Sequence, residues 1–146
     1  QQVDNHTLVD HARPHCGSQQ YYKGILDGQA RGAFDGRVVV RPAGAFTDAQ
    51  QKNRNLLLSD TARVDAKPQL EIYNNDVKCT HGSATGRLDD DALFYLRSRG
   101  FSREEATGVL TLAFAREIVD RVPLEPLKQH LTERVLGWLA GHREAP

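Results

Sequence analysis

Short apolar runs separated by turn signals fill the first 88 residues, and none of these runs carries a helical period. Asp27-Gly28, Asp35-Gly36 and Asn74-Asn75 are typical turn pairs between such runs. Many short strands without intervening helices indicate an all-β segment over residues 1–88. The predicted strands are Thr7–Ala12, Gln19–Leu26, Ala30–Phe34, Arg37–Arg41, Asn55–Leu58, Ala62–Ala66, Gln69–Tyr73 and Val77–Thr80.

A weak repeat runs through this segment. Ile25–Arg31, Leu57–Arg63 and Ile72–Lys78 each carry two apolar residues, a polar turn, a small apolar residue and a basic residue. A fainter copy starts at Val40, so the four starts lie 15, 17 and 15 residues apart. A short and nearly constant period is typical of solenoid coils, each of which buries its apolar face on its neighbours. We therefore predict a parallel β-solenoid; a β-sandwich is the alternative, and it fits the regular spacing less well.

Beyond residue 88 the apolar positions take on helical spacing. A first helix is predicted between a capping residue, Asp89, and Gly100. Ser102 and Glu105 form a capping box that begins a second helix, which Pro123 breaks. The second helix carries the apolar positions Ala106, Val109, Leu110, Ala113, Phe114, Val119 and Val122. The third carries Leu124, Leu127, Leu131, Val135, Trp138 and Leu139. We therefore expect two parts, the β-rich residues 1–88 and a helical subdomain over residues 89–146, whose apolar stripes need a covering surface.

Composition narrows the class of protein. The 19 basic residues balance the 19 acidic ones, so no bulk charge favours nucleic acid or an anionic membrane. No apolar run approaches the roughly 20 residues of a membrane helix. Two cysteines are too few for a disulfide framework, which favours a reducing cytoplasm. Since the chain has no methionine and begins in mid-pattern at Gln1, we expect a C-terminal piece of a longer protein.

Three histidines and a cysteine near the start form a first candidate cluster: His6, His11, His15 and Cys16. On a strand, His11 and His15 share one face and Cys16 points away. Their spacing does not match the paired-cysteine knuckles of structural zinc sites. A metal or partner site and a set of polar strand residues paired with neighbours both stay open here.

Cys79 and His81 form the second candidate, with Asp76 and Lys78 close by. Two residues apart on a strand, the two side chains project from the same face with backbones about 7 Å apart. Thiolate and imidazole suit a soft or borderline metal such as iron in a cluster or zinc. Two ligands do not close a site, so a partner chain or a distant segment must supply the others. The alternative is that Cys79 is an unreactive residue that only packs in the interior.

Other chemistry is less marked. The sequence has no phosphate-binding glycine loop and no serine elbow. Asn53 and Asn55 fit a polar ladder along one face of a strand. A second class of function is a carbohydrate-active enzyme with a carboxylate pair in a solenoid groove and Tyr21-Tyr22 as a stacking platform. Its candidate carboxylates are Asp48, Asp60, Asp65, Glu71 and Asp76.

Five stretches of the chain carry distinctive motifs: His11–Gly24 (H-x-x-P-H-C-x-S-x-Q-x-Y-K-G), Ala30–Val40, Gln50–Asp60, Lys67–Gly82 and Asp91–Gly100. They resemble the SufB/SufD core family of iron–sulfur cluster assembly proteins. The resemblance covers nearly the whole chain, and the K-C-x-H-G form at Lys78–Gly82 looks like the SufD subunit rather than SufB.

The resemblance implies a right-handed parallel β-helix followed by a small helical C-terminal subdomain. It implies a non-catalytic scaffold in a complex with SufB and the ATPase SufC, where a transient iron–sulfur cluster is built and passed on. The family histidine implicated in cluster assembly maps to His81, and Cys79 is carried over as its neighbour in the motif. No tightly bound cofactor is expected in this chain.

The partners implied are a SufB-type subunit through the β-helix and a SufC-type ATPase through the C-terminal helices. A homodimer is expected when SufB is absent, because a solenoid edge exposes unpaired backbone. A metal-free structural module, which would bind such partners without touching iron, remains a further alternative.

Overall fold

The computed structural model describes residues 1–143, so the last three residues of the predicted helical subdomain lie outside it. The chain divides into two compact units, Gln1–Gly86 and Arg87–Pro146. The first consists of β1 (Gln2–His11), β2 (Gly17–Leu26), β3 (Arg31–Val40), β4 (Asp48–Leu57), β5 (Arg63–Ile72) and β6 (Lys78–Gly86). The second contains α1 (Asp90–Ser98), α2 (Arg103–Val119) and α3 (Glu125–Arg143). The predicted order of a β-rich segment followed by three helices is confirmed.

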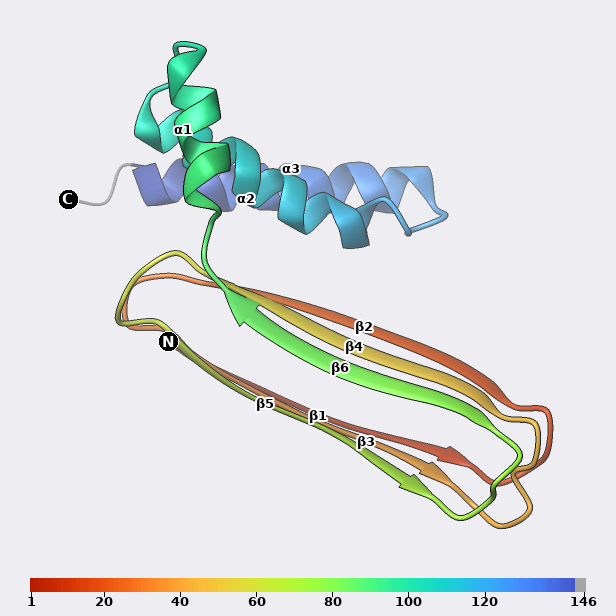
Figure 1. Ribbon diagram of the computed structural model, residues 1–146. Helices are drawn as coiled ribbons and strands as arrows, with labels where there is room; N and C mark the ends of the chain where they lie inside the picture. Colours follow the sequence, from red (N-terminus) through yellow and green to blue (C-terminus); the bar gives the residue numbers. More distant parts are fainter. Residues whose placement is uncertain (144–146) are drawn as a thin grey trace. The chain divides into compact units, whose positions relative to one another are not determined.

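Successive strands of the first unit alternate between two sheets that face each other (Figure 1). One sheet has the order β1-β3-β5 and the other β2-β4-β6, and every pairing is parallel. Each of the strands β1 to β4 therefore pairs with the second strand after it. The parallel pairing predicted from the sequence is confirmed.

One copy of the sequence repeat corresponds to the end of one strand and the turn that follows it. Because paired strands are two strands apart in the chain, a residue pairs with a residue two copies further on. Leu26 pairs with Leu57, and Val40 pairs with Ile72. Each copy of the repeat thus supplies a strand end and a turn, and successive copies belong alternately to the two sheets.

Two predicted strand breaks are wrong. One strand, β3 (Arg31–Val40), runs through both Ala30–Phe34 and Arg37–Arg41 except for their outer end residues. In the same way β5 (Arg63–Ile72) runs through Ala62–Ala66 and Gln69–Tyr73. Gly36 is not a turn residue: a Cβ there would lie 2.5 Å from the Gln51 Nε2 atom and 2.5 Å from the Phe34 ring. The glycine therefore makes room for buried side chains.

Proline is tolerated within β5 because this strand pairs on one side only, with β3, among the described residues. Pro68 lacks the N–H that a second neighbour would need. Other strands are longer than predicted. β1 begins at Gln2 rather than Thr7, the polar residues 48–54 form most of β4, and β6 continues beyond Thr80 to Gly86.

The core of the β unit is centred on the two middle strands. Phe34, Val38 and Val40 of β3 are at most 3% exposed. On β4, buried residues alternate with more exposed ones, and all but the first of the alternating buried residues are polar: Ala49, Gln51, Asn53 and Asn55. The sheets thus enclose an apolar and a polar wall rather than two apolar ones.

The helix starts follow the predicted caps. Asp89 Oδ1 accepts a hydrogen bond from the Ala92 amide at 2.9 Å, and Ser102 and Glu105 form the reciprocal capping box. Gly100 has φ 96°, a left-handed conformation that suits glycine just after a helix.

The buried face of α2 differs from the predicted stripe. Val109 is 43% exposed, whereas Gly108, Thr111 and Ala115 are buried. Small side chains on this face allow close helix approach, and α2 packs against both α1 and α3. No helix among residues 1–143 is both long and apolar enough to span a bilayer.

We predict that Gly36→Ala lowers the free energy of unfolding by about 1–3 kcal/mol, because the added methyl group overpacks the core. Gly82→Ala is the matched control, since no atom lies within 4 Å of the Cβ position at this strand glycine. It should change stability by no more than about 0.5 kcal/mol. Urea denaturation followed by circular dichroism measures both, and equal effects of the two substitutions would contradict the packing role of Gly36.

Candidate functional site

Cys79 and His81 both lie on β6, at the edge of the sheet β2-β4-β6. Among the described residues β6 pairs only with β4, so its outer row of backbone N–H and C=O groups faces no strand. Their spacing places the two side chains on one face of the strand, as predicted. The candidate pair therefore lies at the margin of the fold.

The register shows which face that is. Cys79 pairs with Ala49 and His81 pairs with Gln51, and both partners are at most 1% exposed. Residues in register on parallel strands project to the same side. Cys79 and His81 thus project toward the space between the sheets, and His81 is exposed because it lies on the last strand.

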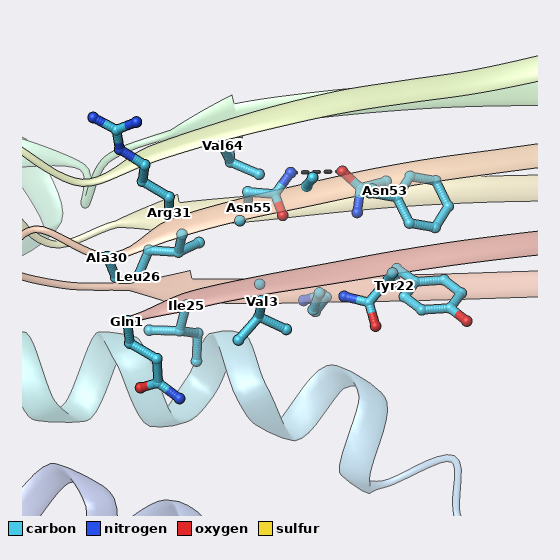
Figure 2. Close-up of a pocket in the computed structure, with 16 residues that line it drawn as sticks. Gln1, Val3, Tyr22, Ile25, Leu26, Ala30, Arg31, Asn53, Asn55 and Val64 are labelled. Atoms are coloured by element: carbon cyan, nitrogen blue, oxygen red, sulfur yellow. Dashed lines mark hydrogen bonds between the residues drawn. The ribbon is translucent and has the colours of Figure 1, made fainter.

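A ladder of polar side chains continues from this pair along the same face. Asn55 Nδ2 donates to Asn53 Oδ1 at 2.6 Å, and Figure 2 shows these two side chains next to each other. From β6, Ser83 Oγ lies 3.4 Å from Asn53 Oδ1, and Thr85 Oγ1 lies 3.4 Å from Asn55 Nδ2. The predicted polar ladder of Asn53 and Asn55 is confirmed, and it extends into the strand of the candidate pair.

Gln51 and Gln20 also belong to this polar interior and were not identified from the sequence. Gln51 Nε2 donates to Gln20 Oε1 at 2.7 Å. The sequence does place Gln51, Asn53 and Asn55 at alternate positions, as on one face of a strand. This pattern identifies Gln51 as a partner of Gln20 only when the strand pairing, which joins residues about 30 positions apart, is known.

Burial raises the pKa of the Cys79 thiol, and the nearby Asp48 carboxylate acts in the same direction. A hydrogen bond with the backbone of Ala49 opposes both. In this chain alone the thiol is therefore held in its neutral form to higher pH than usual. A cation at the site would favour the thiolate, which is the ligating form.

The first candidate cluster is not brought together. His11 is buried, with Nε2 2.9 Å from Ser18 Oγ, whereas the His15 ring stacks on Phe46 at 4.8 Å between centroids. His6 is exposed on β1, and Cys16 is half-buried just before β2. No group of three or more His, Cys, Asp or Glu residues within the described part of the chain is arranged to hold a metal.

The residues singled out for carbohydrate chemistry are separated as well. Tyr22 packs on Phe34, with ring centroids 4.7 Å apart, whereas Lys52 Nζ lies 5.4 Å from the Tyr21 ring centroid. Consecutive strand residues project to opposite faces, so the tyrosines do not form one platform. Glu71 is paired with Arg37 at 3.4 Å.

A cavity of about 310 Å³ lies between the sheets, lined by residues of β1 to β5 that include Tyr22, Asn53 and Asn55 (Figure 2). Neither Cys79 nor His81 lines it. Two amides of its lining, those of Asn53 and Asn55, are hydrogen-bonded to each other. The cavity is therefore separate from the candidate pair.

Comparison with known proteins identifies a family. A family model described as "SUF system FeS cluster assembly, SufBD core domain" matches residues 1–114. The chain is 42% identical over 138 residues to the iron–sulfur cluster assembly protein SufD of Escherichia coli, covering 94% of this chain and 33% of that protein. It is 43% identical over 132 residues to an iron–sulfur cluster assembly SufBD family protein of Synechocystis, covering 90% and 29%.

SufD of Bacillus subtilis is 35% identical over 108 residues, covering 74% of this chain and 25% of that protein. The chain thus spans between a quarter and a third of the length of these relatives.

We predict that Cys79 is alkylated more slowly in the folded chain at neutral pH than in the unfolded chain, and that its rate rises at higher pH. The raised pKa is the cause, because the thiolate is the nucleophile. Ionisation then favours the unfolded state as the pH rises past the thiol's unfolded pKa. Iodoacetamide labelling of a Cys16→Ser variant with and without denaturant measures this, with Cys79→Ser as control. The same pH dependence in both states would contradict it.

Proposed function

The chain belongs to the SufBD core family of iron–sulfur cluster assembly proteins, and on that premise we propose that it acts as a non-catalytic, SufD-type scaffold on which a nascent cluster is built. The cluster is the cargo of such a scaffold and not its resident cofactor. ATP hydrolysis falls to a SufC-type partner, in agreement with the lack of a phosphate-binding glycine loop in this sequence. We place the protein in the cytoplasm, where its two free thiols stay reduced.

One observation carries the proposal: a thiol and an imidazole share one face of an edge strand. Cys79 and His81 are ligand types suited to iron in a cluster. Because two ligands do not close an iron site, a second subunit supplies the others. The unpaired edge of β6 is suited to such a partner, since a strand added there gains a full ladder of backbone hydrogen bonds.

We assign the partner at this edge as a SufB-type subunit whose own strands meet β6. In this proposal the alternating sheets are coils of a right-handed parallel β-helix. The return of each strand to the same sheet in parallel orientation supports the coil, and the preference of parallel crossovers for the right hand supports the handedness. The inward-facing Cys79 and His81 then lie where the two β-helices join.

The helical unit is the proposed docking surface for the ATPase. Large apolar side chains remain exposed on it, with Phe94 74% and Leu124 64% exposed. Exposed apolar surface of this kind is typical of partner-binding sites.

We predict that His81→Ala in the full-length protein leaves the complex assembled and its melting temperature nearly unchanged, while iron bound to the complex and cellular cluster supply are lost. The side chain is exposed, so its removal breaks few packing contacts. Iron analysis of the purified complex and complementation of a cluster-deficient strain measure the effect. Cys79→Ala should have a smaller effect.

Thr80→Ala is the matched control, because Thr80 is an exposed neighbour that projects from the opposite face of β6. It should retain both iron and cluster supply. Normal cluster formation by His81→Ala, or its unfolding, would show that the ligand assignment is wrong.

We also predict that deletion of Ser102–Pro146 abolishes co-purification with the ATPase and preserves the β-sheet circular dichroism signal, because the β strands form a compact unit of their own. Phe94→Ser should weaken the same interaction without unfolding the helices. Undiminished co-purification of the deletion variant would refute the docking role.

A further inference from the structure

We propose that Gln51 is a positioning residue for His81: its side-chain oxygen accepts a hydrogen bond from the ring N–H of His81 and leaves the other ring nitrogen free to bind iron. The inference rests on the proposed function of His81. It assigns a role to a residue that lies 30 positions away in the sequence.

The two residues are neighbours in one column of side chains. Gln20 pairs in register with Gln51, and Gln51 pairs in register with His81. Adjacent strands lie about 4.8 Å apart, so side chains in the column are within reach of each other. The Gln20–Gln51 hydrogen bond of 2.7 Å shows that contact along the column already occurs one strand earlier.

Half of the Gln51 amide is left without a partner. The side chain is 1% exposed, its Nε2 atom donates to Gln20, and its Oε1 atom is buried with no hydrogen bond. A buried acceptor without a donor costs free energy, so such an atom calls for a functional explanation. Because nitrogen and oxygen diverge from the same amide carbon, the oxygen is directed away from the hydrogen bond to Gln20.

The amide is held in place by its packing. Its Nε2 atom lies against Gly36 of the opposite sheet, where a Cβ atom would approach it to 2.5 Å. The acceptor therefore has a fixed location, and the donor must move to it. His81 lies exposed on the edge strand, so its ring is free to turn toward the Gln51 oxygen.

A neutral imidazole has one N–H donor and one nitrogen lone pair. A hydrogen bond from the N–H to a fixed acceptor selects one tautomer and orients the ring, which is how metal-ligating histidines are commonly held. With Gln51 as acceptor, the remaining lone pair of His81 is presented to the metal.

Thr7 carries a second buried polar atom of the β unit that lacks a hydrogen bond, its Oγ1 atom. Thr7 pairs in register with Gly36, the glycine against which the Gln51 amide packs. It lies on β1, at the opposite edge of its sheet from β5. Thr7→Val removes this hydroxyl at nearly constant volume and should leave His81 unaffected.

The test is the tautomer of His81, measured by NMR on isotope-labelled histidine in the full-length protein above the titration range of histidine. His81→Ala assigns the signal. We expect one dominant tautomer in the wild type and a mixture in Gln51→Leu, with the dominant tautomer restored in Gln51→Glu, which keeps an acceptor. Iron bound to the complex should fall about tenfold or more in Gln51→Leu.

Asn53→Leu is the matched control, because it disturbs the next buried column and leaves the Gln51 oxygen in place. If Gln51→Leu does not fold, Gln51→Met keeps the side-chain length without the acceptor. The same His81 tautomer in the wild type and in the variant lacking the acceptor would overturn the inference, as would an equal change in Asn53→Leu. Equal iron in wild type and His81→Ala would instead refute the proposed function, whatever the tautomer.

Discussion

Parallel pairing of each strand with the second strand after it is the constraint on which the β unit depends. A parallel ladder satisfies the backbone of both strands only in a fixed register, so residues about 30 positions apart stack in columns. A polar group buried in a column between the sheets then costs free energy unless it is hydrogen-bonded. Val38 and Val40 avoid this cost because they are apolar, and Asn53 and Asn55 reduce it by their hydrogen bond. The columns therefore connect side chains that are far apart along the chain.

The same constraint places reactive groups at an edge. Columns that are closed and buried at β4 continue into β6, where no further strand covers them within the described residues. Cys79 and His81 occupy this last position, so they combine the orientation of interior residues with access from outside. This combination suits a site that is completed by a second subunit. The same register leaves the Gln51 oxygen in the column of side chains that ends at His81.

Local features could be read from the sequence because they depend on neighbouring residues. The caps at Asp89 and Ser102 need only the first helical turn, and both are present. The predicted strand breaks are wrong at positions whose surroundings are formed by segments far away in the sequence. Gly36 resembled a turn glycine, but its role is to admit Gln51 from the opposite sheet. Pro68 resembled a strand break, but an edge strand accommodates it.

The sequence by itself determined the succession of β segment and helices, the helix caps, the paired spacing of Cys79 and His81, and the motifs that resemble the SufB/SufD family. It also showed the repeat of 15 to 17 residues, but not that two copies separate paired strands. Only the tertiary structure decided that His81 pairs in register with Gln51 and that His11 and His15 contact different partners. The physical reason is that strand register is set by hydrogen bonds between distant segments, whereas spacing and caps are set within a few residues of the chain.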